Sequence, residues 1–138
     1  MERTFAIIKP DAVERQLAGR ILQRIEAEGF TIRAMQLRRL TKAQAEGFYA
    51  VHRARPFFQS LTAYMASGPC IVIALEAPDA VAKWRAVIGA TDPGQAAAGT
   101  LRREFGESIE RNATHGSDGP ETAAFELGYF FPGIDFAR

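Results

Sequence analysis

The sequence predicts an α+β domain with a mainly antiparallel sheet that helices cover on at least one face. Continuous apolar runs at residues 4–9 and 70–76 are typical of buried strands. Residues 30–40 begin with an alternating apolar pattern, which is typical of a strand with one face in water. Segments with helical periodicity separate these runs, so strands and helices follow one another in mixed order.

The chain has 138 residues, which is the size of one ordinary domain, and we expect residues 1–138 to form it. Seventeen Lys and Arg side chains face 16 Asp and Glu side chains, for a formal net charge of +1. A charge this small creates no general attraction for nucleic acid or for anionic membranes. Any basic patch must therefore be local.

Cys70 is the one cysteine of the sequence. It excludes an intramolecular disulfide, and with two histidines it cannot complete a Cys/His zinc site. The first apolar run meets Lys9, far short of a signal peptide. We therefore expect a soluble, cytoplasmic protein.

Helical patterns cover residues 12–28, 41–51, 57–66, 78–88, 99–105 and 121–131. We expect Gly29 to end the first of these helices and Thr41 to be the N-cap of the second. Residues 89–99 read as a long loop, and residues 109–117 as an irregular segment with one short strand. We expect residues 132–138 to pack on a surface or on a neighbouring subunit.

Three charged residues occupy positions where apolar side chains are expected. Arg85 shares a helical face with Trp84, and Glu126 shares one with Leu127. Lys9 stands at the end of an apolar strand. Arg85 could lay its stem on apolar surface with its head in water, or it could bind an anion, and Glu126 could lie in water at the edge of its stripe.

The two histidines differ in their surroundings. His52 could contribute to an anion pocket or could be a half-buried structural residue. His115 lies among small polar residues and a glycine, with three cations near it in the sequence: Arg102, Arg103 and Arg111. A neutral imidazole accepts a phosphoryl group readily, so this setting favours chemistry on phosphate. The sequence contains no Walker A motif and no G-x-G-x-x-G loop, which excludes the P-loop and protein-kinase templates.

The segment NATHGSD at residues 112–118 resembles the active-site signature of the nucleoside diphosphate kinases. Further matching segments follow the family's order and spacing: FAIIKPDAV at 5–13, FYAVHRARPFF at 48–58, GATDP at 89–93 and GTLRREF at 99–105. The resemblance therefore covers essentially the whole chain. It departs at Arg103 and Glu104, where the family commonly has Gly-Asp, and at Ala98, where Pro is common.

The resemblance implies a ferredoxin-like βαββαβ sandwich, with an antiparallel four-stranded sheet and additional helices. It also implies that the terminal phosphate of a nucleoside triphosphate, mainly ATP, passes to nucleoside diphosphates by a ping-pong mechanism. The cofactor would be Mg²⁺, held mainly by the nucleotide phosphates and not by protein ligands.

The resemblance also implies roles for individual residues. His115 would be the nucleophile that becomes phosphohistidine, Glu126 would orient its ring with Ser117 beside it, and Lys9 would complete the catalytic set. Phe57 would stack on the base, while Asn112 and Lys9 would reach the ribose hydroxyls. The remaining residues would line the phosphate path with Lys9: Tyr49, His52, Arg85, Thr91 and Arg102.

The expected partners are nucleoside di- and triphosphates and further copies of the chain. A tetramer is favoured over a dimer or a hexamer, and we expect neither a membrane nor a dedicated nucleic-acid partner. One alternative is a regulatory or nucleic-acid-binding protein on the same fold, with a basic patch of Arg33, Arg38, Arg39 and Lys42. Another is phosphotransfer from His115 to a protein histidine. Loss of the nucleophile or of a phosphate clamp would favour the first alternative, and neither is lost.

Overall fold

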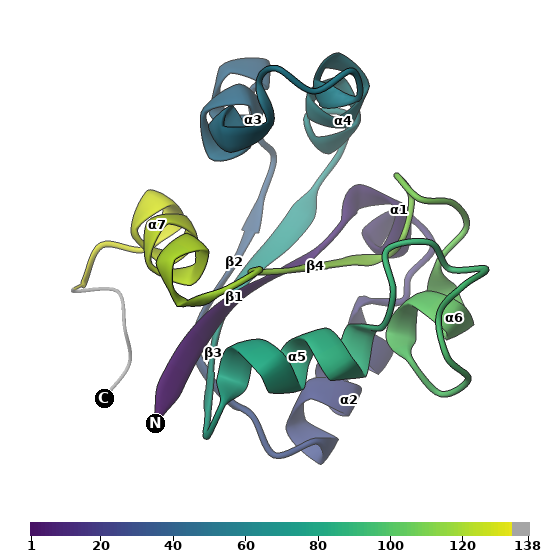
Figure 1. Ribbon diagram of the computed structural model, residues 1–138, viewed down its shortest axis with the longest axis vertical. Coiled ribbons are helices and arrows are strands. Elements are labelled where there is room, and N and C mark those ends of the chain that lie inside the picture. The colour runs from purple at the N-terminus through teal and green to yellow at the C-terminus, as the bar shows by residue number, and fades with distance from the viewer. Residues whose placement is uncertain (134–138) are drawn as a thin grey trace.

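A four-stranded antiparallel sheet forms the centre of the computed structural model, which describes residues 1–133 (Figure 1). Its strands lie in the order β2-β3-β1-β4, with these bounds: β1 (Glu2–Ile8), β2 (Thr31–Arg38), β3 (Cys70–Ala77) and β4 (Thr114–Gly116). Every pairing within the sheet is antiparallel. This confirms the predicted ferredoxin-like α+β architecture.

Helices cover both faces of the sheet, and alternate residues of β1 point to each face. Ala6 and Ile8 belong to one core cluster, and Phe5 and Ile7 belong to the other. Figure 1 shows the two layers on opposite sides of the sheet. The first layer holds α1 (Pro10–Glu14), α2 (Ala18–Ala27), α5 (Ala80–Ile88) and α6 (Leu101–Phe105), and the second holds α3 (Lys42–Phe48), α4 (Phe58–Met65) and α7 (Pro120–Phe130).

The continuous helix predicted over residues 12–28 is wrong, because the chain forms α1 and then α2. Gln16 adopts a left-handed φ of 60° between them. The amide of Leu17 donates to the carbonyl of Ala12 at 2.9 Å, and that of Gln16 donates to Val13 at 3.0 Å, which is the bonding pattern of a Schellman cap. Such caps usually carry glycine at the left-handed position, so glutamine left no signal in the sequence.

Other helix boundaries follow the sequence signals closely. Gly29, with φ of 90°, caps α2 by the same bonding pattern that ends α1. The Thr41 hydroxyl accepts from the amide of Gln44 at 3.0 Å, and the Gln44 side chain accepts from the amide of Thr41 at 2.9 Å. The predicted helix over residues 41–51 nevertheless ends at Phe48, and a 3₁₀ turn over Ala50–His52 follows.

The pairing of β4 with β1 orients the segment that contains both His115 and Gly116. His115 lies opposite Ile7, and Gly116 lies opposite Ala6. Because facing residues of paired strands share a side of the sheet, His115 points to the layer of α3, α4 and α7. Gly116 faces α5, and a Cβ added to Gly116 would lie 2.7 Å from the indole of Trp84.

No helix within residues 1–133 combines the length and apolar character needed to cross a membrane. Residues 134–138, which make up most of the tail predicted to pack on a surface or a subunit, lie outside the described residues.

Gly89→Ala is expected to lower the free energy of unfolding by about 2 kcal/mol. Gly89 has φ of 86°, and a Cβ there would lie 2.6 Å from the hydroxyl of Thr100. Urea unfolding of both proteins measures the loss. Gly19→Ala is the matched control, because nothing lies within 4 Å of its added Cβ and alanine favours the helix. Equal stability of Gly89→Ala and wild type would contradict the argument.

Candidate active site

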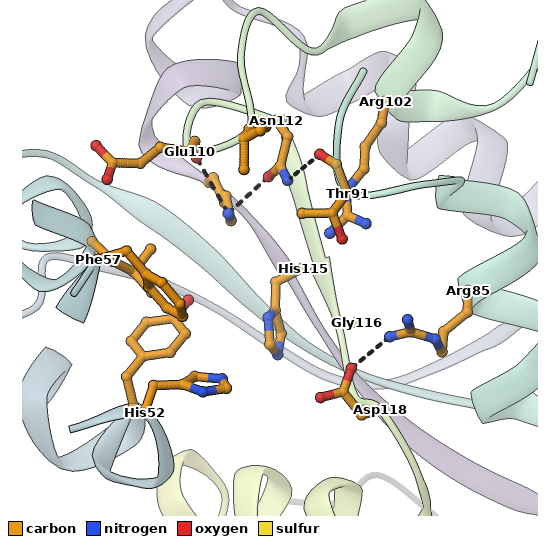
Figure 2. A pocket seen from close by; sticks show the side chains of 14 residues that line it. His52, Phe57, Arg85, Thr91, Arg102, Glu110, Asn112, His115, Gly116 and Asp118 are labelled. Atoms are coloured by element: carbon orange, nitrogen blue, oxygen red, sulfur yellow. Dashed lines mark hydrogen bonds and ion pairs between the residues drawn. The ribbon is translucent and has the colours of Figure 1, made fainter. Parts of the chain in front are cut away.

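A cavity of about 330 Å³ opens beside β4 and holds nine of the predicted site residues (Figure 2). These residues come from segments far apart in the sequence: Lys9, Tyr49, His52, Phe57, Arg85, Thr91, Arg102, Asn112 and His115. The structure thus brings together every residue that was expected to bind nucleotide. Glu126 and Ser117 contact one another and do not line the cavity.

A carboxylate that does not line the cavity holds the imidazole of His115. Its Nε2 lies 3.0 Å from Oε1 of Glu126, whose side chain is 13% exposed. The Ser117 hydroxyl donates to the same oxygen at 2.6 Å. Because a carboxylate only accepts, Nε2 carries the proton, and in the neutral ring Nδ1 keeps its lone pair. Nδ1 is therefore the nitrogen available to the cavity. Glu126 therefore lies inward and not in water at the edge of its helical stripe.

The rest of the His115 residue is also restrained. The indole Nε1 of Trp84 donates to the carbonyl of His115 at 3.0 Å. The rings of Phe48, Phe5 and Tyr49 stand edge-on to the imidazole, with centroids 5.5, 6.1 and 6.1 Å away. These contacts limit rotation of the ring, so Nδ1 has a fixed direction.

Lys9 is a buried cation whose ammonium group points into the cavity. It is 5% exposed, and its Nζ donates to Oδ1 of Asn112 at 2.7 Å and to the carbonyl of Glu110 at 3.3 Å. The Asn112 amide in turn donates to the carbonyl of Thr91 at 3.0 Å. Burial, with a smaller effect from Arg102, lowers the pKa of Lys9 from 10.5 to about 8.

Arg102 is a second buried cation, and two backbone carbonyls hold its guanidinium. Nη1 donates to Gly89 at 3.0 Å, and Nη2 donates to Thr114 at 2.9 Å. Burial, and then the nearby charge of Arg85, lowers its pKa to about 10. Its Nε and the hydroxyl of Tyr49 are buried without a hydrogen-bond partner in the described part of the chain. A bound anion is the kind of group that satisfies such donors.

The prediction that Arg85 lies on the buried face of its helix is wrong. Trp84 and Ile88 are buried, whereas the side chain of Arg85 is 45% exposed at the edge of that face. From there it reaches the cavity, where Nη1 contacts Oδ1 of Asp118 at 2.7 Å (Figure 2). Helical periodicity identifies a wide stripe and cannot separate its centre from its edge.

Of the three arginines expected around His115, only Arg102 lines the cavity. Arg103 donates to the carbonyl of Gly94 at 3.2 Å. Arg111 lies over the ring of Tyr64, 5.1 Å from its centre. Lys9 and Arg85, which the family resemblance placed on the phosphate path with Arg102, complete the group of cations in the cavity.

Five cavity residues were not predicted: Leu61, Ile109, Glu110, Gly116 and Asp118. Gly116 and Asp118 stand in the quoted motif, but nothing in their residue types separates them from an ordinary polar loop. Ile109 had a detectable signal, because it is an apolar residue within the charged run from Glu107 to Arg111. Nothing in the sequence pattern marked Glu110.

Comparison with known proteins is consistent across sequence and structure. The nucleoside diphosphate kinase family model matches residues 2–136. The chain is 61% identical to the nucleoside diphosphate kinase of Desulfovibrio desulfuricans over 100% of this chain and 99% of the relative. A crystal form of the Aquifex aeolicus enzyme superposes with a TM-score of 0.97 at 44% identity, covering 99% of each chain. The Halobacterium salinarum enzyme in complex with CDP gives 0.95 at 35% identity, covering 99% of this chain and 91% of that one.

The pKa of Lys9 predicts how stability depends on pH. The folded value of about 8 lies below the ordinary 10.5, so between these values the unfolded chain binds more protons. The free energy of unfolding should therefore rise with pH through this window. We expect the free energy of unfolding of wild type to rise by about 1 kcal/mol more than that of Lys9→Met between about pH 7 and pH 9, measured by urea unfolding. If the two proteins differed in unfolding free energy by the same amount at both pH values, the lowered pKa of Lys9 would be contradicted.

Proposed function

The chain belongs to the nucleoside diphosphate kinase family and is an enzyme of that activity, and we propose that His115 carries the phosphoryl group. One observation carries this assignment. Glu126 holds Nε2 of the ring, which leaves Nδ1 open to a cavity that contains Lys9, Arg85 and Arg102. A nucleophile directed at a group of cations suits transfer of an anionic phosphoryl group.

In the first half of the reaction, the lone pair of Nδ1 attacks the terminal phosphorus of a nucleoside triphosphate. A P–N bond forms and the bond from phosphorus to the bridging oxygen breaks, so the nucleoside diphosphate leaves with that electron pair. Glu126 accepts the Nε2 proton in a hydrogen bond and stabilises the positive charge that develops on the ring. In the second half, a terminal oxygen of another nucleoside diphosphate attacks the phosphohistidine, and the P–N bond breaks.

The cations stabilise charge on the phosphate oxygens during both halves. Arg102 is already held by two carbonyls, so it needs little rearrangement when the phosphates arrive. Arg85 contacts Asp118, and a phosphate group bound by Arg85 would replace that carboxylate. Tyr49, His52 and Thr91 complete the phosphate path, and all three line the cavity.

The nucleoside occupies the opposite end of the same cavity in this proposal. Phe57 is 46% exposed, and its ring offers a stacking surface to the base. Lys9 and Asn112, which contact one another, would reach the ribose hydroxyls. Stacking depends weakly on the identity of the base, so we expect broad nucleotide specificity with ATP as the main donor.

We propose Mg²⁺ as the cofactor, arriving on the nucleotide phosphates. The two carboxylates of the cavity, Glu110 and Asp118, lie on different sides of His115 and do not form a cage for an ion (Figure 2). Phosphate oxygens are the ligands that suit this donor set. When bound, the ion neutralises phosphate charge and so assists the transfer.

We also propose that residues 1–138 act as one cytoplasmic catalytic domain that assembles into a homo-oligomer, with a tetramer favoured over a dimer or hexamer. The edge strand β2 supports self-association, because Met35 and Leu37 expose apolar side chains on it.

The alternative of a nucleic-acid-binding protein has less support. Arg33 lies 3.8 Å from the carboxylate of Glu76, and Arg38 lies over the ring of Phe130. Arg39 donates to the carbonyl of Ser67 at 3.5 Å, and Lys42 donates to Oε1 of Gln59 at 3.4 Å, so all four residues of the supposed basic patch have other partners. Phosphotransfer to a protein histidine would use the same His115, but it leaves the exposed ring of Phe57 without a role.

Mixing the protein with ATP and Mg²⁺ should add one phosphate to its intact mass, and a second nucleoside diphosphate should remove it. His115→Ala should take up no phosphate, because the nucleophile is gone. His52→Ala is the control and should still be labelled, since His52 is not the nucleophile. A labelled His115→Ala protein, or an unlabelled wild type that binds nucleotide, would contradict the proposed mechanism.

Arg85→Ala should reduce kcat/KM about tenfold to a hundredfold, because one cation is lost from the transition state. Steady-state kinetics with ATP and a second nucleoside diphosphate measures the effect. Arg103→Ala is the control, because Arg103 does not line the cavity. An unchanged rate in Arg85→Ala would mean that Arg85 only pairs with Asp118.

A further inference from the structure

The cavity wall beside Phe57 consists of two segments that have no direct connection in the sequence. Helix α4 and its N-cap contribute Phe57 and Leu61, and the segment before β4 contributes Ile109 and Glu110. Phe57 and Ile109 expose 46% and 60% of their surfaces. Two exposed apolar side chains in the wall of one cavity form a site for a flat, largely apolar ring.

A hydrogen bond joins these two segments. The hydroxyl of Ser60, on α4, donates to Oε2 of Glu110 at 2.7 Å across 50 positions of sequence. The bond is charge-assisted, since its acceptor is a carboxylate. In Figure 2 the carboxylate of Glu110 points to the side of the cavity where Phe57 lies.

Glu110 also contacts the other part of the site, through its backbone. Its carbonyl accepts from Nζ of Lys9 at 3.3 Å. The same residue therefore restrains Lys9 through the main chain and α4 through the side chain. Changing the side chain removes the second restraint and leaves the carbonyl in place.

We propose that the bridge between Ser60 and Glu110 positions the two walls of the nucleobase slot, so that Glu110 is a positioning residue for the base of the substrate. This inference rests on the proposed function, because it assumes that the base stacks on Phe57. The bridge restricts the separation of α4 from the Ile109 segment before the nucleotide arrives. Binding then costs less ordering of the wall, which favours substrates that have a base to place there.

The loss of nucleotide affinity should depend both on the Ser60–Glu110 hydrogen bond and on the presence of a base. A comparison of variants tests the first dependence, and a comparison of ligands tests the second. Glu110→Gln keeps an oxygen that can accept from Ser60 and removes the charge, whereas Glu110→Ala and Ser60→Ala remove the bond. Ribose 5-diphosphate has the sugar and phosphates of ADP without the base. Calorimetric titration with ADP and with ribose 5-diphosphate measures Kd for each variant. Gln59→Ala is the matched control, because Gln59 neighbours Ser60 on α4 and does not line the cavity.

Ser60→Ala and Glu110→Ala should each raise Kd for ADP about threefold to tenfold, and the double variant should be no weaker than either single one. Gln59→Ala should bind ADP like wild type, and Glu110→Gln, which keeps a weaker neutral hydrogen bond to Ser60, should lose less ADP affinity than Glu110→Ala. Kd for ribose 5-diphosphate should be unchanged throughout, and kcat for transfer from ATP should stay near wild type at saturation.

Equal losses for ADP and ribose 5-diphosphate would overturn the proposal, because the side chain would then act through Lys9 and the phosphates. A loss in Glu110→Gln as large as in Glu110→Ala would overturn it too, since charge and not the bond would matter. Unchanged ADP binding in all variants would also overturn it. Failure of the proposed function is a separate result, seen as a wild type that takes no phosphate on His115.

Discussion

The antiparallel pairing of β4 with β1, in which His115 lies opposite Ile7 and Gly116 opposite Ala6, determines how the site is built. A shift of one residue in this register would turn the imidazole to the α5 face and Gly116 away from Trp84. In the observed register the ring lies in the layer that holds α3 and α7. Glu126, on α7, can therefore reach Nε2 of His115.

The same site contains cations that are costly to bury, and the backbone offsets part of that cost. Carbonyls of Gly89 and Thr114 hold Arg102, and the carbonyl of Glu110 contributes to holding Lys9. Within residues 1–133, no carboxylate accepts a hydrogen bond from the Arg102 guanidinium or from the Lys9 ammonium, so their charge stays directed at the cavity. Lowered pKa values of both residues express that unfavourable burial, and an anionic ligand relieves it.

Where a local interaction decided the structure, the sequence pattern was a good guide. Thr41 caps α3 with Gln44, and Gly29 ends α2, because each signal acts over a few residues. Gln16 was missed because it adopts a conformation that glycine usually takes. Arg85 was misplaced because periodicity gives the face of a helix, while the position of α5 against the sheet decides which edge of that face meets the cavity.

The sequence by itself indicated the chemistry: a histidine among small polar residues, a carboxylate at Glu126 on an apolar helical stripe, and a family resemblance along the chain. It also determined the order of strands and helices, since apolar periodicity is a local property. Only the tertiary structure decided that Arg103 and Arg111, which are near His115 in the sequence, contact Gly94 and Tyr64 and do not line the cavity. It also decided that Glu110 accepts a hydrogen bond from Ser60 on α4. Such contacts join residues dozens of positions apart, and they depend on how packed layers meet, which no local pattern records.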